Sequence, residues 1–335
     1  MEEFIDNLPK AELHLHIEGS FEPELMFKIA KRNRIDIPYN SVEDVKKAYQ
    51  FNCLEDFLKI YYQGAQVLIH EEDFFELTFS YLQKCVNQNI RHAEIMFDPQ
   101  THTNRGIAFR TVIEGILKAC DKAEKELGIS TVIIMNYLRH LSEEEAFTTL
   151  EQSIPFKDKI YAVGLDSSEY GHPPSKFKNV FEASIKAGYV PVAHAGEEGP
   201  ADYIWEALEL LKIQRIDHGN NALQDEKLLA EIIKRNLALT VCPLSNLALQ
   251  VVKNLKDHPL KIMMDKGLAV TVNSDDPAYF GGQLNENYKE IQKALELSKE
   301  DVYLLAKNSF HYSFANKERK EHYLTELETY FENNK

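Results

Sequence analysis

The feature that most constrains the fold is the regular alternation of short apolar runs with helical segments after residue 90. The apolar runs are rich in Val, Ile, Leu and Ala, as in IRHAEIMFDP, and helical patterns such as TVIEGILKACDKAEKELG follow them. Near-continuous apolar strands are typical of parallel strands buried on both faces. With the earlier run AELHLHIEGS, the strand candidates are residues 11–20, 90–99, 129–139, 160–169, 189–197, 215–220, 237–246 and 269–277.

Eight strands that alternate with helices predict a closed (β/α)8 barrel of the TIM type. An open doubly wound sheet is the alternative, but no G-x-G-x-x-G turn or Walker lysine supports a nucleotide-binding version of it. The length of 335 residues fits one large barrel domain over residues 1–335.

Two segments lie outside the regular alternation. Residues 23–86 contain several patterns with apolar residues at helical spacing. Because a simple connection between two parallel strands needs only one helix, this segment predicts a helical insertion over the mouth of the barrel. Near the C-terminus, DVYLLAKNSFHYSF and KERKEHYLTELETYFENN predict additional amphipathic helices on the outside of the barrel.

The charge and the termini narrow the range of partners. The formal net charge is −15, which repels nucleic-acid phosphates and anionic membranes, so we expect neither as a partner. The start MEEFIDNLPK lacks an apolar signal region, and we expect a cytoplasmic protein. The four cysteines follow no C-x-x-C spacing, which indicates reduced, mostly buried thiols. A homo-oligomer is left open.

Polar side chains gather where the predicted strands end. Barrel enzymes build their active sites from the C-terminal ends of the strands. A buried charge without a partner costs several kcal/mol, so histidines and carboxylates at four strand ends indicate a functional site. These residues are His14, His16 and Glu18 after the first strand, His194 and Glu197 after the fifth, Asp217 and His218 after the sixth, and Asp275 and Asp276 after the eighth.

The first candidate within this group is a metal site. His14 and His16 are two apart in a strand and therefore point the same way. With His194 and Asp275 they form a nitrogen and oxygen ligand set that suits zinc, while iron, cobalt and manganese stay open. Glu197 and His218 are left as acid and base candidates, or as groups that only orient the ligands.

The motifs AELHLHIEGS, HAGEEG, RIDHGN and VNSDDP, in this order and spacing, resemble those of the adenosine and adenine deaminase family of the amidohydrolase superfamily. The resemblance covers nearly the whole chain. It implies a barrel with one catalytic zinc per subunit, in which a zinc-activated water replaces the exocyclic amine of a 6-aminopurine and ammonia leaves. It assigns His14, His16, His194 and Asp275 to the zinc, Glu197 to purine N1, His218 with Asp275 to the attacking water, and Asp276 to purine N7.

The same resemblance bears on the substrate. The adenosine branch usually has H-x-H-L-D-G, whereas HLHIEG here contains Glu18, whose additional methylene pushes the carboxylate into the ribose space. The segments DSSEYGHPPSKF and NSDDPAYFGG also look like the adenine branch. We therefore expect adenine to be converted to hypoxanthine, a purine salvage reaction, with Glu18, Asp166, Ser167 and Glu169 on the substrate side closing the ribose pocket.

Several alternatives are weaker. Adenosine, N6-substituted adenines and modified nucleosides stay open as substrates. A non-catalytic purine-binding barrel would be expected to lack a ligand or the proton donor, and none is missing. Deaminases with H-x-E and P-C-x-x-C signatures are disfavoured, because Cys242 is followed by Pro243 and Leu244 with no second cysteine. Superfamily members with a carboxylated lysine after the fourth strand are disfavoured because that strand ends in Asp166 and Ser167.

Overall fold

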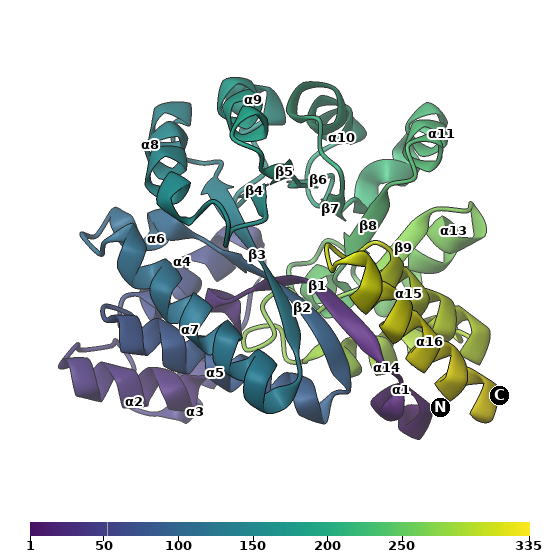
Figure 1. Ribbon diagram of the computed structural model, residues 1–335, viewed down its shortest axis with the longest axis horizontal. Coiled ribbons are helices and arrows are strands. Elements are labelled where there is room, and N and C mark those ends of the chain that lie inside the picture. The colour runs from purple at the N-terminus through teal and green to yellow at the C-terminus, as the bar shows by residue number, and fades with distance from the viewer. Residues whose placement is uncertain (52) are drawn as a thin grey trace.

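The predicted apolar runs form parallel strands at the centre of a TIM barrel, and helices surround them (Figure 1). The computed structural model describes residues 1–51 and 53–335. The strands are β1 Lys10–His16, β2 Ile90–Phe97, β3 Ser130–Leu138, β4 Ala162–Asp166, β5 Val190–Pro191, β6 Ala193–Ala195, β7 Ile216–His218, β8 Ala238–Val241 and β9 Ala269–Val272. Their order along the chain is also their order in space, with β1 to β5 in one sheet and β6 to β9 in the other.

The fifth predicted strand is divided into β5 and β6. Pro191 ends β5, and a proline has no N–H group for the ladder of hydrogen bonds. Val192 between the two short strands still donates its N–H to Val163 O of β4, at 2.8 Å. This bond links the end of the first sheet to the start of the second.

At the other junction, β1 meets the segment after β9. Asp275 N donates to His14 O at 3.0 Å, and His16 N donates to Asp275 O at 3.0 Å. Asn273 adds a side-chain bond, because its Oδ1 accepts from Leu13 N at 3.0 Å. The backbone therefore ties the H-x-H strand directly to the aspartate predicted to share its metal.

Helices follow the strands as the sequence predicts. The long helix between β2 and β3 is capped at its C-terminus by Gly128, whose φ of 70° suits a glycine at that position. Ser142 begins the next helix with a capping box to Glu145. The helices from β2 to β9 are α6 Pro99–Thr103, α7 Phe109–Leu127, α8 Glu143–Ser153, α9 Lys178–Lys186, α10 Ala201–Glu206, α11 Glu226–Lys234, α12 Pro243–Ala248 and α13 Leu260–Asp265.

The segment between β1 and β2 is helical, as predicted. It contains α2 Pro23–Asn33, α3 Val42–Ala48, α4 Leu54–Ala65 and α5 Glu71–Asn87, while Asn52 lies outside the described residues. Phe57 and Tyr61 of α4 pack in one apolar cluster with Leu249, Tyr279 and Phe280, which follow β8 and β9. Because those loops lie at the C-terminal ends of the strands, α4 covers the mouth of the barrel.

The chain termini lie close to one another at the outside of the barrel (Figure 1). The N-terminal helix is α1 Glu2–Asn7, and the last helices are α14 Leu284–Leu295, α15 Lys299–His311 and α16 Lys317–Asn333. Ser309 of α15 accepts a hydrogen bond from Ala11 N of β1 at 2.9 Å. Tyr330 of α16 donates to Phe4 O of α1 at 3.0 Å.

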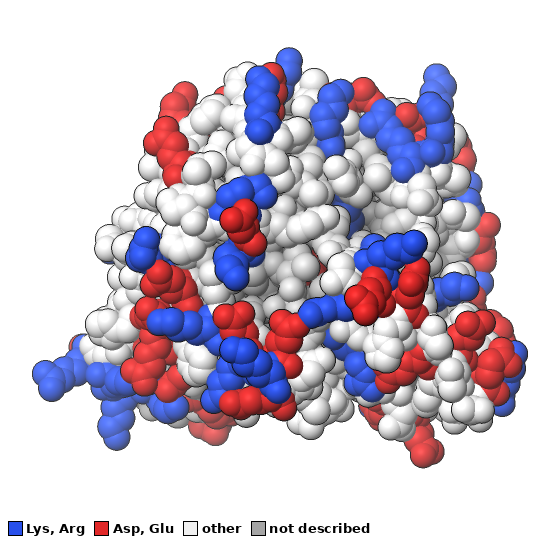
Figure 2. All heavy atoms as spheres, viewed as in Figure 1, with Lys and Arg blue, Asp and Glu red and all other residues white. Residues whose placement is uncertain are grey.

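The surface charges are mixed in sign on the face shown in Figure 2, and the cysteines are free thiols. On the face shown in Figure 2, acidic and basic side chains lie beside one another and neither sign forms a continuous patch. Cys85, Cys120 and Cys242 are buried free thiols, and Cys53 is half-buried and free. In the described ranges, no helix is long and apolar enough to cross a membrane.

Candidate active site

Four of the predicted ligand atoms meet at the C-terminal ends of the strands. His194 Nε2 lies 3.0 Å from His14 Nε2 and 3.2 Å from His16 Nε2. Asp275 Oδ1 lies 3.3 Å from His14 Nε2 and 3.5 Å from His16 Nε2. All four residues are buried. Three segments that lie far apart in sequence, around residues 14–16, 194 and 275, thus converge on one point.

This arrangement fits a metal ion. Four atoms that bind zinc tetrahedrally at about 2.0–2.2 Å lie roughly 3.3–3.6 Å from one another, close to the distances found here. Burial and the neighbouring imidazoles hold the pKa of His194 well below its usual value, which keeps it in the neutral form that binds metals. Burial opposes ionisation of Asp275, but His14 holds the pKa of this carboxyl well below its usual range.

His218 is a second imidazole within reach of the same point. His14, His194, His218 and Asp275 have possible ligand atoms within 4.8 Å of one another. The Nε2 atom of His218 lies 3.8 Å from the nearest oxygen of Asp275, farther than His16 Nε2 does. The distances therefore favour His16 over His218 as the fourth ligand.

A buried polar network orients the imidazole ring of His14 through its Nδ1 atom. His14 Nδ1 lies 2.9 Å from Thr240 Oγ1, which donates to Asp217 Oδ1 at 2.8 Å. Arg215 Nε donates to the same Asp217 oxygen at 3.0 Å, and its guanidinium also pairs with buried Glu94. Outer groups of this kind fix the ring orientation of a metal-binding histidine. The sequence predicted Asp217 only as a polar residue at the end of a strand. In the structure it supports the predicted metal ligand His14.

Glu197 and His218 lie next to the predicted metal ligands and line the same cavity. His218 Nε2 lies 3.6 Å from Glu197 Oε2. Burial, followed by the charge of Asp275, raises the pKa of Glu197 well above its usual value, which favours the protonated carboxyl. Burial lowers the pKa of His218 to about 3, so the imidazole is neutral at neutral pH. The cluster thus has a carboxyl that favours its protonated form beside an uncharged imidazole.

Backbone strain marks the same region. Ser167, His218 and Asp275 have φ angles of 75°, 64° and 63°, in the left-handed region that residues other than glycine rarely adopt. Such strain costs about 1–3 kcal/mol each and tends to occur at functional sites.

Asp276 lies beside the metal cluster and lines the same cavity. Burial, with the charges of Asp275 and Asp98, raises the pKa of Asp276 well above its usual value. Its side chain packs directly on Gly19, where any Cβ atom would overlap Asp276 Oδ1. The glycine of HLHIEG therefore leaves the room that the Asp276 carboxyl occupies.

Glu18 is buried next to the cavity and is held by a chain of hydrogen bonds. Its Oε1 lies 2.8 Å from His102 Nε2, and His102 Nδ1 lies 3.0 Å from Arg105 Nη2. A guanidinium only donates, so His102 Nδ1 accepts and His102 Nε2 donates to Glu18. Burial and the charge of Asp98 raise the pKa of Glu18 to about 8. The sequence indicated no role for His102 or Arg105.

Asp166 and Ser167 line the cavity, as predicted for the substrate side. Asp166 Oδ2 accepts from Asn136 Nδ2 at 2.7 Å and lies 3.4 Å from His16 Nδ1, so this carboxyl also orients a predicted ligand. Burial and a hydrogen-bonded Asp98 raise the pKa of Asp166 well above its usual value. Ser167 Oγ lies 3.2 Å from Tyr62 OH.

Glu169 has a different environment. Its carboxylate accepts four backbone N–H bonds: Oε1 from Gly196 at 2.7 Å, and Oε2 from residues 197, 198 and 199 at 3.1, 2.9 and 2.8 Å. Among the described residues that line the cavity, neither Glu169 nor Glu18 is included. Glu169 holds the HAGEEG loop, and with it Glu197.

The cavity itself lies between the strand ends and α4. It is narrow, with a volume of about 40 Å³. Sequence reasoning missed several of its residues. Asp98 stands at the end of β2 and could have been found by the rule used for the other strand ends, whereas the α4 residues could not be told from core by periodicity. The missed lining residues are Leu54, Phe57, Leu58, Tyr61 and Tyr62 of α4, Asp98, and Leu249.

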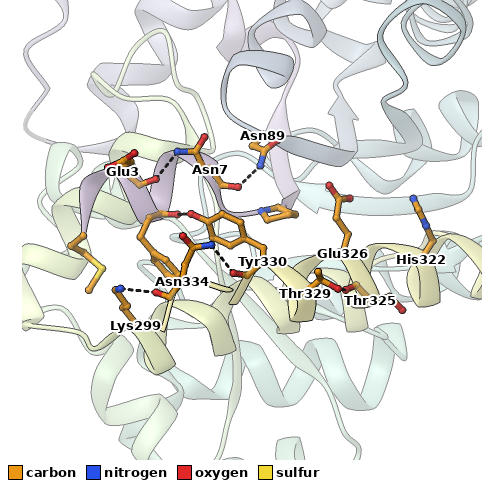
Figure 3. A pocket seen from close by; sticks show the side chains of 13 residues that line it. Glu3, Asn7, Asn89, Lys299, His322, Thr325, Glu326, Thr329, Tyr330 and Asn334 are labelled. Atoms are coloured by element: carbon orange, nitrogen blue, oxygen red, sulfur yellow. Dashed lines mark hydrogen bonds between the residues drawn. The ribbon is translucent and has the colours of Figure 1, made fainter. Parts of the chain in front are cut away.

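A larger hollow of about 870 Å³ lies elsewhere, between α1, the residues preceding β1 and β2, and α16 (Figure 3). This is the N-terminal end of the strands, away from the predicted metal ligands. Its polar groups bond to one another: Asn7 donates to Glu3 O, Asn89 to Asn7 O, and Lys299 to Asn334 O. We therefore place the active site in the smaller cavity.

Comparisons with known proteins identify the family of the chain. The family model described as Adenosine deaminase matches residues 9–330. Adenine deaminase from Acinetobacter baylyi is 57% identical over 325 residues, covering 97% of this chain and 98% of the relative. Adenine deaminase from Wolinella succinogenes is 58% identical over 327 residues, covering 98% and 99%.

Solved structures give the same result. The crystal structure of adenine deaminase from Arthrobacter aurescens has a TM-score of 0.95 and 45% identity, and the match covers 97% of this chain and 99% of that one. A zinc-bound amidohydrolase from Burkholderia ambifaria shares the fold, with a TM-score of 0.91 and 22% identity over 99% and 93% of the two chains. The barrel, its four motifs and the match over nearly the whole length together show that the chain belongs to the adenosine deaminase family.

Proposed function

We propose that this protein is a metal-dependent aminohydrolase that converts adenine and water to hypoxanthine and ammonia. The observation that carries this function is the four-ligand cluster beside a carboxyl of raised pKa: His14, His16, His194 and Asp275 lie close to Glu197 in one buried site. Adenine as the substrate is supported by curated adenine deaminases that are 54–58% identical over nearly the whole chain.

We assign His14, His16, His194 and Asp275 as the residues that hold one zinc ion. Three imidazoles and a carboxylate are ligands that zinc prefers. The zinc-bound amidohydrolase with the same fold supports this choice of metal. When bound, zinc supplies Lewis acidity, which makes water an effective nucleophile at neutral pH.

The side chains around this point divide the proton transfers. Glu197 donates its proton to purine N1, which withdraws electron density from C6 and makes that carbon electrophilic. His218 Nε2, kept neutral by burial, accepts the proton of the attacking water and is positioned against the carboxylate of Asp275. The exocyclic amine then gains the proton held by His218, the C6–N bond breaks and ammonia leaves, while the C6 hydroxyl proton passes to Glu197 and hypoxanthine remains.

The remaining polar residues orient the purine. Asp276, whose raised pKa favours the protonated carboxyl, donates to purine N7. Asp166 and Ser167 line the cavity, with Asp166 next to His16, and Glu18 is buried beside His102. Glu169 fixes the loop that carries Glu197.

Steady-state kinetics on adenine and adenosine, measured side by side with metal-replete protein, test this function. Loss of 6-aminopurine absorbance and release of ammonia should give a higher kcat/KM for adenine. A higher kcat/KM for adenosine would contradict the assigned substrate.

A further inference from the structure

Glu12 is a buried carboxyl of β1 that the proposed mechanism does not use. Its two oxygens bind one residue: Oε2 accepts from the Ser274 hydroxyl at 2.6 Å, and Oε1 accepts from Ser274 N at 3.1 Å. Glu12 and Ser274 are both buried, and neither is among the described residues that line the cavity. An effect of Glu12 on the site must therefore pass through the residues next to Ser274.

The residue that follows Ser274 is Asp275, whose backbone is strained. Its φ of 63° lies in the left-handed region, which residues other than glycine rarely adopt and which persists only where the surroundings hold it. Asp275 N donates to His14 O, and Asp275 O accepts from His16 N, both at 3.0 Å. These two bonds fix the peptide groups of Asp275, and the bonds of Glu12 fix the residue before it. These holding groups all belong to β1.

The strained conformation decides where two carboxyls point. In an extended strand, consecutive side chains point to opposite faces. Asp275 and Asp276 are consecutive, but both line the cavity. Asp275 Oδ1 lies 3.3 Å from His14 Nε2, at the predicted metal site, while the carboxyl of Asp276 packs against Gly19. The turn at Asp275 therefore brings both carboxyls to the same cavity.

We propose that Glu12 is a positioning residue of the metal site. By binding Ser274 through both oxygens, it holds Asp275 in the left-handed conformation that presents its carboxylate to the metal. In this way β1 supplies the ligands His14 and His16 and also sets the position of Asp275. The inference rests on the metal site of the proposed function, but not on the identity of the purine.

Two variants separate the bonds to Ser274 from the charge of Glu12. Glu12→Ala removes both bonds. Glu12→Gln keeps them, because the amide oxygen accepts from Ser274 N and the NH₂ group donates to the hydroxyl, which also accepts. We expect Glu12→Ala to weaken zinc binding by about 10- to 100-fold in a chelator competition and to shift the visible absorption band of the cobalt-loaded protein. Glu12→Gln should resemble the wild type in both measurements.

Melting temperatures distinguish this role from a role in stability alone. A residue that only stabilises the fold lowers the melting temperature equally with and without zinc. A residue that positions a ligand lowers it more with zinc, because weaker binding stabilises the folded protein less. At the same excess of zinc, an affinity that is weaker by about 10- to 100-fold narrows the difference between the zinc-loaded and the metal-free protein by about 2–4 °C.

Glu143→Ala is the matched control. Glu143 of α8 also binds backbone N–H groups of another segment, those of Asn179 and Val180, at 2.7 and 3.0 Å. Its loss should lower both melting temperatures equally and leave the zinc affinity unchanged.

Two results with the Glu12 variants would overturn the inference. One is a Glu12→Ala protein that keeps the zinc affinity and cobalt spectrum of the wild type and whose melting temperature falls equally with and without zinc. The other is a Glu12→Gln protein as impaired as Glu12→Ala, which would mean that the charge of Glu12 acts and not its bonds to Ser274. If Glu12→Ala does not fold, Ser274→Ala, which removes only the hydroxyl bond, should still weaken zinc binding, and an unchanged affinity would overturn the inference. A wild type that binds zinc and leaves adenine unchanged would instead refute the proposed function.

Discussion

Glu169→Gln separates two roles for a residue that the sequence placed on the substrate side. In the structure its carboxylate accepts four backbone N–H bonds from residues 196–199. A glutamine has one oxygen and one NH₂ group. If the oxygen keeps the three bonds made by Oε2, the NH₂ group faces Gly196 N–H, and two donors then oppose one another.

The expected cost follows from these bonds. Hydrogen bonds to a charged group contribute about 1.5–3 kcal/mol, and a buried N–H without an acceptor costs about 1–3 kcal/mol. One bond is lost and three lose their charge, so we expect a destabilisation of about 3 kcal/mol. With an unfolding entropy of about 2.1 cal/mol/K per residue, 335 residues give about 0.7 kcal/mol/K, and the melting temperature should fall by about 4 °C.

Activity should fall together with stability, because Glu197 lies on the loop that Glu169 holds. A displacement of a reacting group by about 1 Å costs on the order of 100-fold in rate, so we expect kcat to fall 10- to 100-fold with little change in KM. Differential scanning calorimetry and adenine kinetics measure both effects. Glu144→Gln, the same change at an exposed residue of α8, is the control. An unchanged melting temperature with a raised KM would refute the loop-holding role and favour direct contact with substrate.

Three further predictions follow from the same geometry. Glu197→Gln should keep the metal, measured by elemental analysis, and lose about 10²–10⁴-fold in kcat, because an amide cannot donate the proton to N1; a fully active variant would refute that role. Thr240→Val removes the hydroxyl that lies 2.9 Å from His14 Nδ1 and should weaken metal binding by about 10- to 100-fold in a chelator competition, whereas unchanged affinity would show that the ring needs no such support. Burial lowers the pKa of Lys10 to about 7, so between pH 7 and about 10.5 the unfolded chain binds more protons and this group stabilises the fold increasingly as pH rises. Urea unfolding should therefore show that the free energy of unfolding of the wild type, relative to that of Lys10→Met, rises by up to about 1.4 kcal/mol per pH unit above pH 7. A difference between the two proteins that does not change with pH would contradict this prediction.

Much of the fold could be predicted because it depends on local pattern. Apolar runs bounded by polar residues indicate buried parallel strands whatever their distant partners are. The division at Pro191 could be read only from the structure, because the register with β4 decides whether a proline N is needed for a bond. The insertion could be recognised as helical from its periodicity. The contact of α4 with Tyr279 and Phe280 is a tertiary contact, which the periodicity of a single segment cannot predict.

The candidate site was predictable where a barrel rule applied. His14, His194 and Asp275 stand at strand ends, and all strand ends of a parallel barrel meet at one face. The same rule would have included Asp98. His102 and Arg105 could not be found, because their effect on Glu18 runs through a chain of two hydrogen bonds between residues of α6 and its flanks and a turn more than 80 residues earlier.

The most direct test of the account is a metal titration of the metal-free protein with adenine as the substrate. We predict that hypoxanthine and ammonia form in equal amounts, that the rate rises in proportion to added zinc up to one equivalent per chain, and that it then stays constant. Full turnover of adenine without metal, or a zinc-saturated protein that leaves adenine unchanged, would contradict it.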